Sequence, residues 1–367
     1  MKRNIPNEMK PWQRKKLFRS VILVLIIAGT FLGLACATLY RDKAGEEAYW
    51  DSALTISEDV AQKIEEYSAD ATVVTVGTYI ENLKEINIKS CNFRVVFLAW
   101  FKWEGDPALD MLNNFRVYKG YINKTEVVKE LHDGDLNYQL VRVDATITKN
   151  YWTTRFPLES HQLRIYLESD YMVNDVIFVP DTENSGLNGN MSISGFDVVR
   201  FDTGSYAMQY ETAHGDPEVA EDAVLITSEH VTALELNRAG AGLYVKCFIA
   251  LVGTLTWVLI ALFICTNHHV DPLAMIPAAL FGTVANIMVG ANLLPDALQT
   301  GLVEFVNLWG VMIILMCAVS IIQINRIRKK YEDKDFSQFY GRIMFYTLLT
   351  LTLAGNIAMP LCAYIFM

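Results

Sequence analysis

The histidines and cysteines are the side chains best suited to bind a metal or to act as nucleophiles, but their spacing fits neither task. His268 and His269 are adjacent, so on a helix or strand they would not share a face, and Cys265 lies deep in an apolar run. The sequence also has no nucleophile motif and no phosphate-binding loop. We therefore expect no enzyme activity, no metal site and no other cofactor.

A second kind of chemistry is indicated by polar side chains within the apolar run Leu273–Leu294. Helical spacing places six residues of this run on one side of a helix: Met275, Ala279, Gly282, Thr283, Asn286 and Gly290. Hydroxyl and amide groups are costly inside a membrane unless they have partners. Water in a pore would satisfy them, so these six residues are candidates for a pore lining. Alternatively, the same face packs closely against a neighbouring helix.

Asp271 lies two residues before the start of this run, and Pro272 is between them. In an oligomer, Asp271 would form an acidic ring at the cytoplasmic mouth of a pore and would favour cations. Alternatively, Asp271 is a helix N-terminal cap, where its negative charge interacts favourably with the helix dipole. The sequence leaves both interpretations open.

Nearly uncharged runs near the N-terminus and in the last third indicate a membrane protein with one large aqueous domain. The runs are Val21–Tyr40, Leu243–Cys265, Leu273–Leu294, Leu302–Ile324 and Ile343–Met367. Each has about the 20 residues that a helix needs to cross a bilayer. We predict a basic lead at 1–19, an anchor helix at 20–40, a helical linker at 41–71, an aqueous domain at 72–240 and a four-helix membrane domain at 241–367. Residues 20–40 could alternatively be a signal peptide, because Ala35-Cys36-Ala37 fits a cleavage site.

Two basic clusters predict the orientation of the chain. One lies in residues 1–19 and the other in Asn325–Lys330, and cytoplasmic loops carry an excess of Lys and Arg. The N-terminus is then cytoplasmic, the aqueous domain is extracytoplasmic, and we expect the inner (plasma) membrane with lipid as a partner. The formal net charge is −10. Because the acidic residues lie mostly in the aqueous domain, nucleic acid is not expected as a partner.

The region 72–236 consists of short alternating stretches separated by turn-forming residues, which is typical of a β-sandwich. Two of these stretches, Val141–Thr148 and Leu163–Glu168, flank a loop with a Phe-Pro-Leu tip. That tip is too apolar for a solvated turn and needs an apolar surface. Glu46–Tyr67 has the spacing of an amphipathic helix. We predict an extracytoplasmic β-sandwich, then four transmembrane helices, with an additional N-terminal transmembrane helix: an α+β membrane protein.

Three motifs resemble those of pentameric ligand-gated ion channels, particularly the bacterial type. Thr75–Ile88 followed by Phe93–Trp103 is similar to the first two strands of that family. Arg155-Phe156-Pro157-Leu158-Glu159, with Gln162 and Leu163, resembles the Cys-loop, and Leu234–Arg238 resembles the strand before the membrane. The flanking cysteine pair is absent, as in bacterial members. Only Cys91 lies in the aqueous domain, so this domain has no internal disulfide.

The resemblance implies functional residues in two places. A ligand site between subunits would be walled by aromatic residues, here Phe115, Tyr171, Tyr206 and Tyr210, although aromatic residues on strands are more often packing residues. Coupling to the membrane would involve Lys89, Phe156, Pro157, Leu158, Glu159, Leu294, Pro295 and Asp296, with Arg238 placed to pair with Glu159 or Asp296. The same contacts could also be static.

The function that the resemblance implies is a subunit of a homopentameric, ligand- or proton-gated channel that conducts inorganic cations. The alternative is a non-conducting membrane receptor, sensor or assembly protein with the same fold. The alternative is favoured if Thr283 and Asn286 point at a neighbouring helix of the same chain. If protons are the ligand, many carboxylates of the aqueous domain are plausible sensors, and none stands out.

Overall fold

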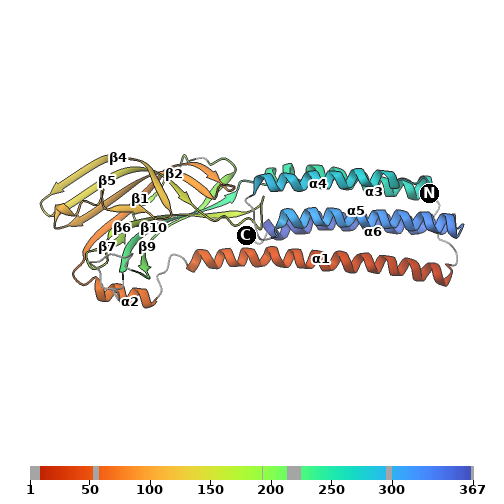
Figure 1. The fold of residues 1–367 in the computed structure, drawn as a ribbon, viewed down its shortest axis with the longest axis horizontal. Helices are drawn as coiled ribbons and strands as arrows, with labels where there is room; N and C mark the ends of the chain where they lie inside the picture. Colours follow the sequence, from red (N-terminus) through yellow and green to blue (C-terminus); the bar gives the residue numbers. More distant parts are fainter. Residues whose placement is uncertain (1–8, 53–57, 192, 213–224, 295–299, 365–367) are drawn as a thin grey trace. The chain divides into compact units, whose positions relative to one another are not determined.

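The computed structural model describes residues 9–52, 58–191, 193–212, 225–294 and 300–364 (Figure 1). The chain divides into two compact units. The first, which we call the helical unit, comprises Met1–Gly45, Thr153–Glu159 and Gly240–Met367. The second, which we call the sheet unit, comprises Glu46–Trp152 and Ser160–Ala239. The loop with the Phe-Pro-Leu tip therefore belongs to the helical unit, although both strands that flank it belong to the sheet unit.

The sheet unit contains two β-sheets. The first sheet has the order β4 (Gly120–Asp133), β5 (Leu136–Thr148), β2 (Asn92–Glu104), β1 (Thr72–Asn87) and β7 (Val176–Pro180), and β8 (Gly186–Leu187) pairs with β1. The second sheet has the order β3 (Phe115–Val117), β6 (Ser160–Met172), β10 (Leu225–Arg238) and β9 (Phe196–Tyr210). Neighbouring strands are antiparallel, except that β7 and β8 run parallel to β1.

Side chains of the two sheets form a common core. The ring of Phe101 on β2 lies 5.2 Å from that of Phe115 on β3, and the hydroxyls of Thr78 on β1 and Thr232 on β10 are hydrogen-bonded. Phe101, Phe115 and Thr78 are all buried. Because inward residues alternate with outward ones along a strand, this core uses only one face of each sheet.

The other face of the second sheet is also buried along β6 and β10, which a sheet with one solvated face would not show. The last turns of α1 (Pro11–Ser52) contribute Tyr49, whose carbonyl accepts a hydrogen bond from Arg164 Nη2, and Trp50, which lies under the guanidinium of Arg200. Ile64 of α2 (Glu58–Tyr67) packs on a small cluster around Ile226, which shares the inner face of β10 with Thr232. The end of α1 therefore covers part of the outer face, and α2 packs at the inner one.

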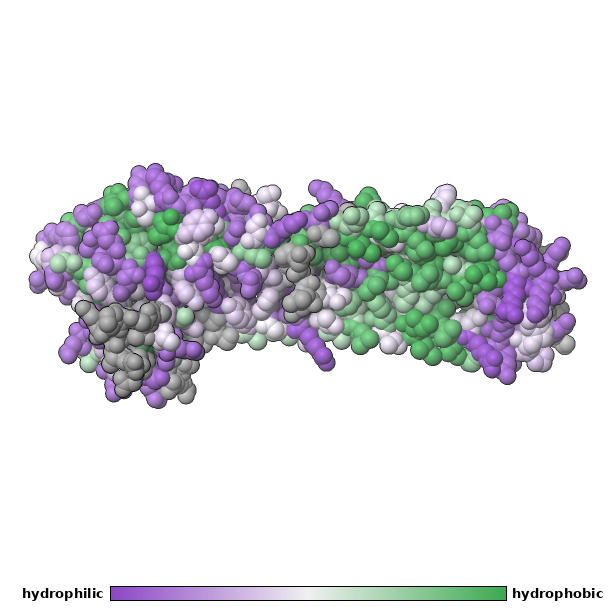
Figure 2. Space-filling model, viewed as in Figure 1, coloured by the Kyte–Doolittle hydropathy of each residue, from purple (hydrophilic) through white to green (hydrophobic). Residues whose placement is uncertain are grey.

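Four helices of the described chain are long and apolar enough to cross a membrane: α1, α3 (Gly242–His268), α5 (Leu302–Lys330) and α6 (Lys334–Tyr364). The helix α4 (Ile276–Leu293), after a 3-10 turn at Leu273–Met275, is a shorter apolar helix. Figure 2 shows hydrophobic residues over most of the visible face of the helical unit, with hydrophilic residues gathered at one end of its helices.

Both basic clusters belong to that hydrophilic end. Trp12 stacks on Tyr331 with the ring centroids 5.0 Å apart, and Gln13 Nε2 donates a 2.6 Å hydrogen bond to Asp333. Lys16 Nζ lies 5.5 Å from the centroid of the Tyr331 ring. The start of α1 is therefore beside the connection between α5 and α6.

Several element boundaries differ from the sequence-based expectations. The anchor helix does not end at Tyr40, because residues 41–52 contain good helix formers and no proline, so α1 continues to Ser52. Residues 53–57, within the predicted amphipathic helix, lie outside the described residues. Most of β4 was not predicted, because its charged sequence has no clear alternation and its strand form comes from pairing with β5. β9 is a single strand, although Gly204 interrupts the alternation of its sequence.

Candidate functional site

The Phe-Pro-Leu loop is held in the helical unit by specific contacts. The amide of Leu302, at the start of α5, donates a 2.7 Å hydrogen bond to the carbonyl of Thr154. A Cβ at Gly301 would lie only 2.5 Å from that carbonyl oxygen, so this close approach requires glycine. Arg155 Nε lies 3.3 Å from Asp42 on α1. Phe156 and Leu158 are buried, in agreement with the expectation that the tip contacts an apolar surface.

The structure corrects the predicted orientation of α4. Ala279, Thr283 and Asn286 are buried, and Asn286 Nδ2 donates a 2.7 Å hydrogen bond to Asn307 Oδ1 on α5. A Cβ at Gly282 would lie 2.4 Å from the Thr254 hydroxyl on α3. The predicted pore-lining face therefore packs against two helices of the same chain. Small and polar residues allow helices to approach one another in a membrane, which is why they gather there.

The remaining pore candidates are less informative. Met275 is partly buried, and the surroundings of the Gly290 position lie outside the described side chains. Asp271 is exposed, and its carboxylate accepts a 3.3 Å hydrogen bond from the amide of Leu273. This contact is local, but the N-cap position of the following 3-10 turn is Pro272, so both interpretations of Asp271 stay open.

The outward face of α4 is apolar. Large apolar side chains exposed on this helix include Phe281, Val284, Ile287, Met288 and Leu293, and Phe281 retains 76% of its accessible surface. In an oligomer, this face and not the Thr283–Asn286 face would contact other chains, lipid or a central axis.

The four aromatic candidates do not form one cage. Phe115 belongs to the core, and Tyr171 Oη donates a 2.9 Å hydrogen bond to the carbonyl of Leu109. Tyr206 packs edge-on against Tyr166, and Tyr210 donates a hydrogen bond to Glu168. The aromatic-cage prediction was wrong for Phe115 because its position on β3 faces the opposite sheet.

The predicted coupling residues have mixed outcomes. The guanidinium of Arg238 lies 4.0 Å from the centroid of the Phe196 ring, a cation–π contact that was not anticipated. Glu159 and Leu294 are buried, and Lys89 is exposed. Pro157 follows Phe156 through a cis peptide bond. Pro295 and Asp296 lie outside the described residues.

A buried carboxylate, Glu168 on β6, organises the outer face of the second sheet. Arg116 on β3 donates two hydrogen bonds to it, of 2.9 and 2.8 Å, and Thr227 on β10 donates a third of 2.7 Å. Tyr210 also donates to it. Burial alone would raise the pKa of Glu168, but these hydrogen bonds outweigh burial and hold the pKa below its ordinary value. Glu168 therefore stays charged at neutral pH.

Glu229 on β10 is directly opposite Glu168 in the strand register and opposite Tyr206 on the other side. Its side chain is 1% exposed, and its Oε1 has no hydrogen-bond partner among the described residues. Burial, and then the charge of Glu168, raise the pKa of Glu229 to about 7, although Lys119 and Arg116 act in the opposite direction. This carboxyl group is therefore able to gain or lose a proton near neutral pH.

Sequence reasoning did not single out Glu229. The one signal in the sequence was the pattern of Thr227–Leu236, where Glu229 lies. In this stretch, polar and charged residues are mixed with apolar ones on both faces of the strand. A strand with both faces buried was not expected in an antiparallel sheet, so Glu229 would have been assigned to the solvent side.

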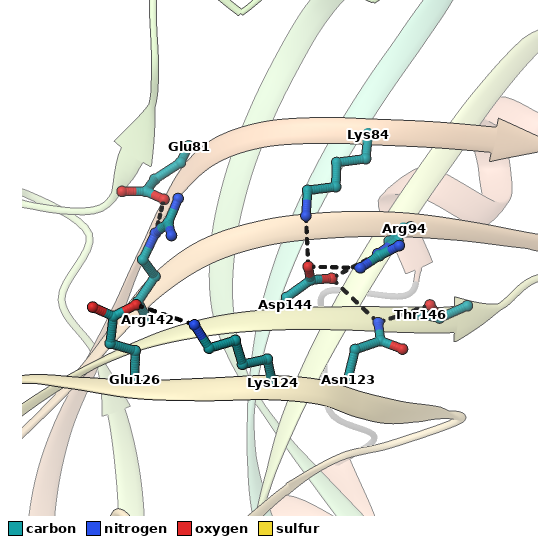
Figure 3. A network of polar contacts seen from close by, with 9 residues as sticks. All are labelled: Glu81, Lys84, Arg94, Asn123, Lys124, Glu126, Arg142, Asp144 and Thr146. Carbon is teal, nitrogen blue, oxygen red and sulfur yellow. Dashed lines mark hydrogen bonds and ion pairs between the residues drawn. The ribbon is translucent and has the colours of Figure 1, made fainter.

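A polar network on the first sheet contains a carboxylate, Asp144, whose surroundings differ from those of Glu229 (Figure 3). Asp144 on β5 accepts hydrogen bonds from Arg94, Lys84 and Asn123 at 2.6 to 3.2 Å. The Arg94 hydrogen bonds in particular hold the pKa of Asp144 far below its usual range. Because Asp144 is fully partnered, it stays ionised throughout the neutral range, unlike Glu229.

No protein-family model and no curated protein matches this chain. Within the described residues, no group of three or more His, Cys, Asp and Glu side chains is arranged to hold a metal ion. The interpretation of the site therefore rests on its geometry.

Proposed function

We propose that this chain is a subunit of a proton-gated, homo-oligomeric membrane channel. The observation that carries the proposal is the buried Glu168–Glu229 pair, in which one carboxyl group is fully hydrogen-bonded and the other lacks a partner for Oε1. Below neutral pH, Glu229 is protonated and neutral, so it does not repel the Glu168 carboxylate. Above neutral pH, two negative charges share a buried site, and their repulsion favours a different packing of this face.

Both strands that carry these carboxyl groups lead directly into the helical unit. β6 begins at Ser160, one residue after the loop whose Thr154 carbonyl is bonded to the start of α5. β10 ends at Arg238, and α3 begins at Gly242. A change in the pairing of β6 and β10 is therefore passed to α3 and α5 through the chain itself.

The channel architecture is supported by the order of the elements. Two sheets that share a core, read as a β-sandwich, are followed by four helices, which is the order implied by the resemblance to pentameric ligand-gated channels. The two basic clusters at one end of the helices support a cytoplasmic N-terminus and an extracytoplasmic sheet unit in the plasma membrane. The subunit number implied is five.

The outward face of α4 suggests how such a channel would close. If α4 lines the axis, then Phe281, Val284 and Met288 form an apolar constriction, and such constrictions block ions by excluding water. Opening then requires a rotation or separation of the α4 helices. The exposed Asp271 before this helix would favour cations at the mouth.

The second candidate is a non-conducting membrane receptor that senses protons. The hydrogen bond between Asn286 and Asn307 favours it, because the polar side chains of α4 are used for packing within the chain. In that case, the membrane helices transmit the change in the sheet unit to a partner and not to a pore.

Flux through liposomes that contain the purified full-length protein separates the two candidates. We expect cation flux to change when the outside pH is stepped from about 8 to about 6, across the pKa of Glu229. The change should be lost in Glu229→Gln, which mimics the neutral acid, and kept in the control Glu235→Gln on the same strand. Val284→Ser on the outward face of α4 should raise the flux of the closed state. A ring-shaped oligomer whose conformation responds to pH without any flux would instead establish the receptor.

A further inference from the structure

The sheet unit contains a cavity of about 560 Å³ beside the end of α1, separate from the Glu168–Glu229 pair. This volume lies in the range of small-molecule sites. Five segments form its walls: the last turns of α1, the start of β2, the connection from β3 to β4, the end of β5 with the residues after it, and the first half of β6. The side chains that matter for binding are Tyr49, Lys119, Lys149, Trp152 and Arg164.

Arg164 is a buried cation aimed at this cavity. It is 7% exposed, and its Nη2 donates 3.2 Å hydrogen bonds to the carbonyl of Tyr49 and to Gln162 Oε1. Its Nε and Nη1 have no partner with good hydrogen-bond geometry among the described residues, although the nearby Tyr166 hydroxyl interacts with the guanidinium. A guanidinium with unused donors in a buried site is costly unless something accepts them.

Two further cations face the same space. Burial and the charge of Arg164 lower the pKa of Lys149 to about 8, so a further negative charge in the cavity would favour its charged form. Lys119 lies at the exposed rim. Glu46 is the one carboxylate in the lining, and it accepts a 2.8 Å hydrogen bond from Ser160. The balance of charge therefore favours an anion.

Flat aromatic surfaces complete the walls. The rings of Tyr49 and Trp152 lie 5.4 Å apart, and both side chains are partly exposed. The Arg164 guanidinium lies 4.3 Å from the centroid of the Tyr49 ring, which holds the cation in place. An aromatic group could stack here while its negative group reaches Arg164 and Lys149.

We propose that this cavity binds a small aromatic carboxylate. Its carboxylate would accept hydrogen bonds from Arg164 and Lys149, and its ring would lie against Tyr49 and Trp152. Because Tyr49 belongs to α1 and Arg164 to β6, the bound anion would join the two segments. Such a ligand would be a second input to the protein besides the proton on Glu229.

Binding of benzoate to the full-length protein in detergent tests this proposal, with tryptophan fluorescence and calorimetry as readouts at one fixed pH near 7. We expect saturable benzoate binding, no binding of benzylamine, and weaker binding of inorganic phosphate. Lys149→Gln and Trp152→Leu should each weaken benzoate binding about tenfold. Lys102→Gln, on an exposed position of β2 outside the cavity, should leave it unchanged.

Three results would overturn the proposal. They are the absence of saturable benzoate binding to the folded parent protein, equal binding of benzylamine, and equal affinity in the parent, Lys149→Gln and Trp152→Leu proteins. Phosphate binding as tight as benzoate binding would overturn the assignment of the aromatic group. Since no pH change or ion flux is measured, failure here is distinguishable from failure of proton gating.

Discussion

Glu229 lies opposite Glu168 in the pairing of β10 with β6, and both side chains are almost completely buried. The two carboxyl groups differ in their partners. Glu168 accepts hydrogen bonds from residues of β3, β10 and β9, whereas Oε1 of Glu229 has no hydrogen-bond partner among the residues described. This asymmetry pushes their pKa values apart, with Glu168 ionised and Glu229 titrating near neutrality.

The stability of the protein should depend on the protonation of Glu229. Its pKa is raised from 4.5 to about 7 in the folded state, so the folded protein binds the proton more tightly. This contribution is complete below about pH 4.5 and is lost as the pH rises to about 7, up to a limit of about 3 kcal/mol. Urea unfolding of the parent and of Glu229→Gln should therefore diverge over this window, with the variant the more stable at pH above 7. Parallel stability curves would show that Glu229 has an ordinary pKa.

Replacement of Arg116 should lower the stability of the folded protein far more than its half-exposed position suggests. Arg116→Gln leaves the buried Glu168 charge without its cation, and we expect a loss of about 2 to 4 kcal/mol in the free energy of unfolding at pH 7. The matched control is Arg94→Gln, whose partner Asp144 is nearer to solvent and keeps Lys84, so its loss should stay below about 1 kcal/mol. Equal losses in the two variants would mean that Glu168 is not a special buried charge.

The Asn286–Asn307 hydrogen bond predicts a double-mutant result. Asn286→Leu or Asn307→Leu alone leaves one buried amide without its partner and should destabilise the helical unit by about 1 to 3 kcal/mol. The double variant should recover much of this loss, because neither amide is then left behind. Thermal unfolding in detergent measures both effects. Additive losses, together with altered ion selectivity in Asn286→Leu, would instead place Asn286 in a pore.

The close contact between Gly301 and Thr154 predicts a variant that uncouples the two units. Gly301→Ala places a Cβ against the Thr154 carbonyl and should break the hydrogen bond from Leu302. We expect the pH-dependent change in flux to be lost while Glu229 still titrates normally. Gly253→Ala on α3 meets no atom within 4 Å and serves as the control. A normal flux response in Gly301→Ala would exclude this loop as the route.

The sequence predicted the sheets and the four long apolar helices well, because their signals are local. The alternation in Phe93–Trp103 and the uncharged run Leu243–Cys265 correspond to β2 and α3. The apolar Phe-Pro-Leu tip also indicated correctly that its loop is not solvated, because Phe156 and Leu158 are buried. The start of α1 beside Tyr331 could not be predicted, because it depends on contacts far apart in the chain.

The candidate site could not be predicted for a related reason. A carboxylate such as Glu229 becomes unusual only when the folded chain buries a sheet face that would otherwise meet water. The prediction of the orientation of α4 failed for a different reason. Thr283 and Asn286 are equally suited to contact with water and to contact with a neighbouring helix. Residue type sets which interactions are possible, and the packing decides between them.

The most direct measurement is the titration of Glu229 in the full-length protein. Infrared difference spectra of parent and Glu229→Gln protein isolate the carboxylic acid C=O stretch of this residue, which can be followed as the pH is raised. We predict a band that is present at acidic pH and disappears with a midpoint of about 7. A midpoint near the ordinary value of 4.5 would contradict proton sensing by Glu229.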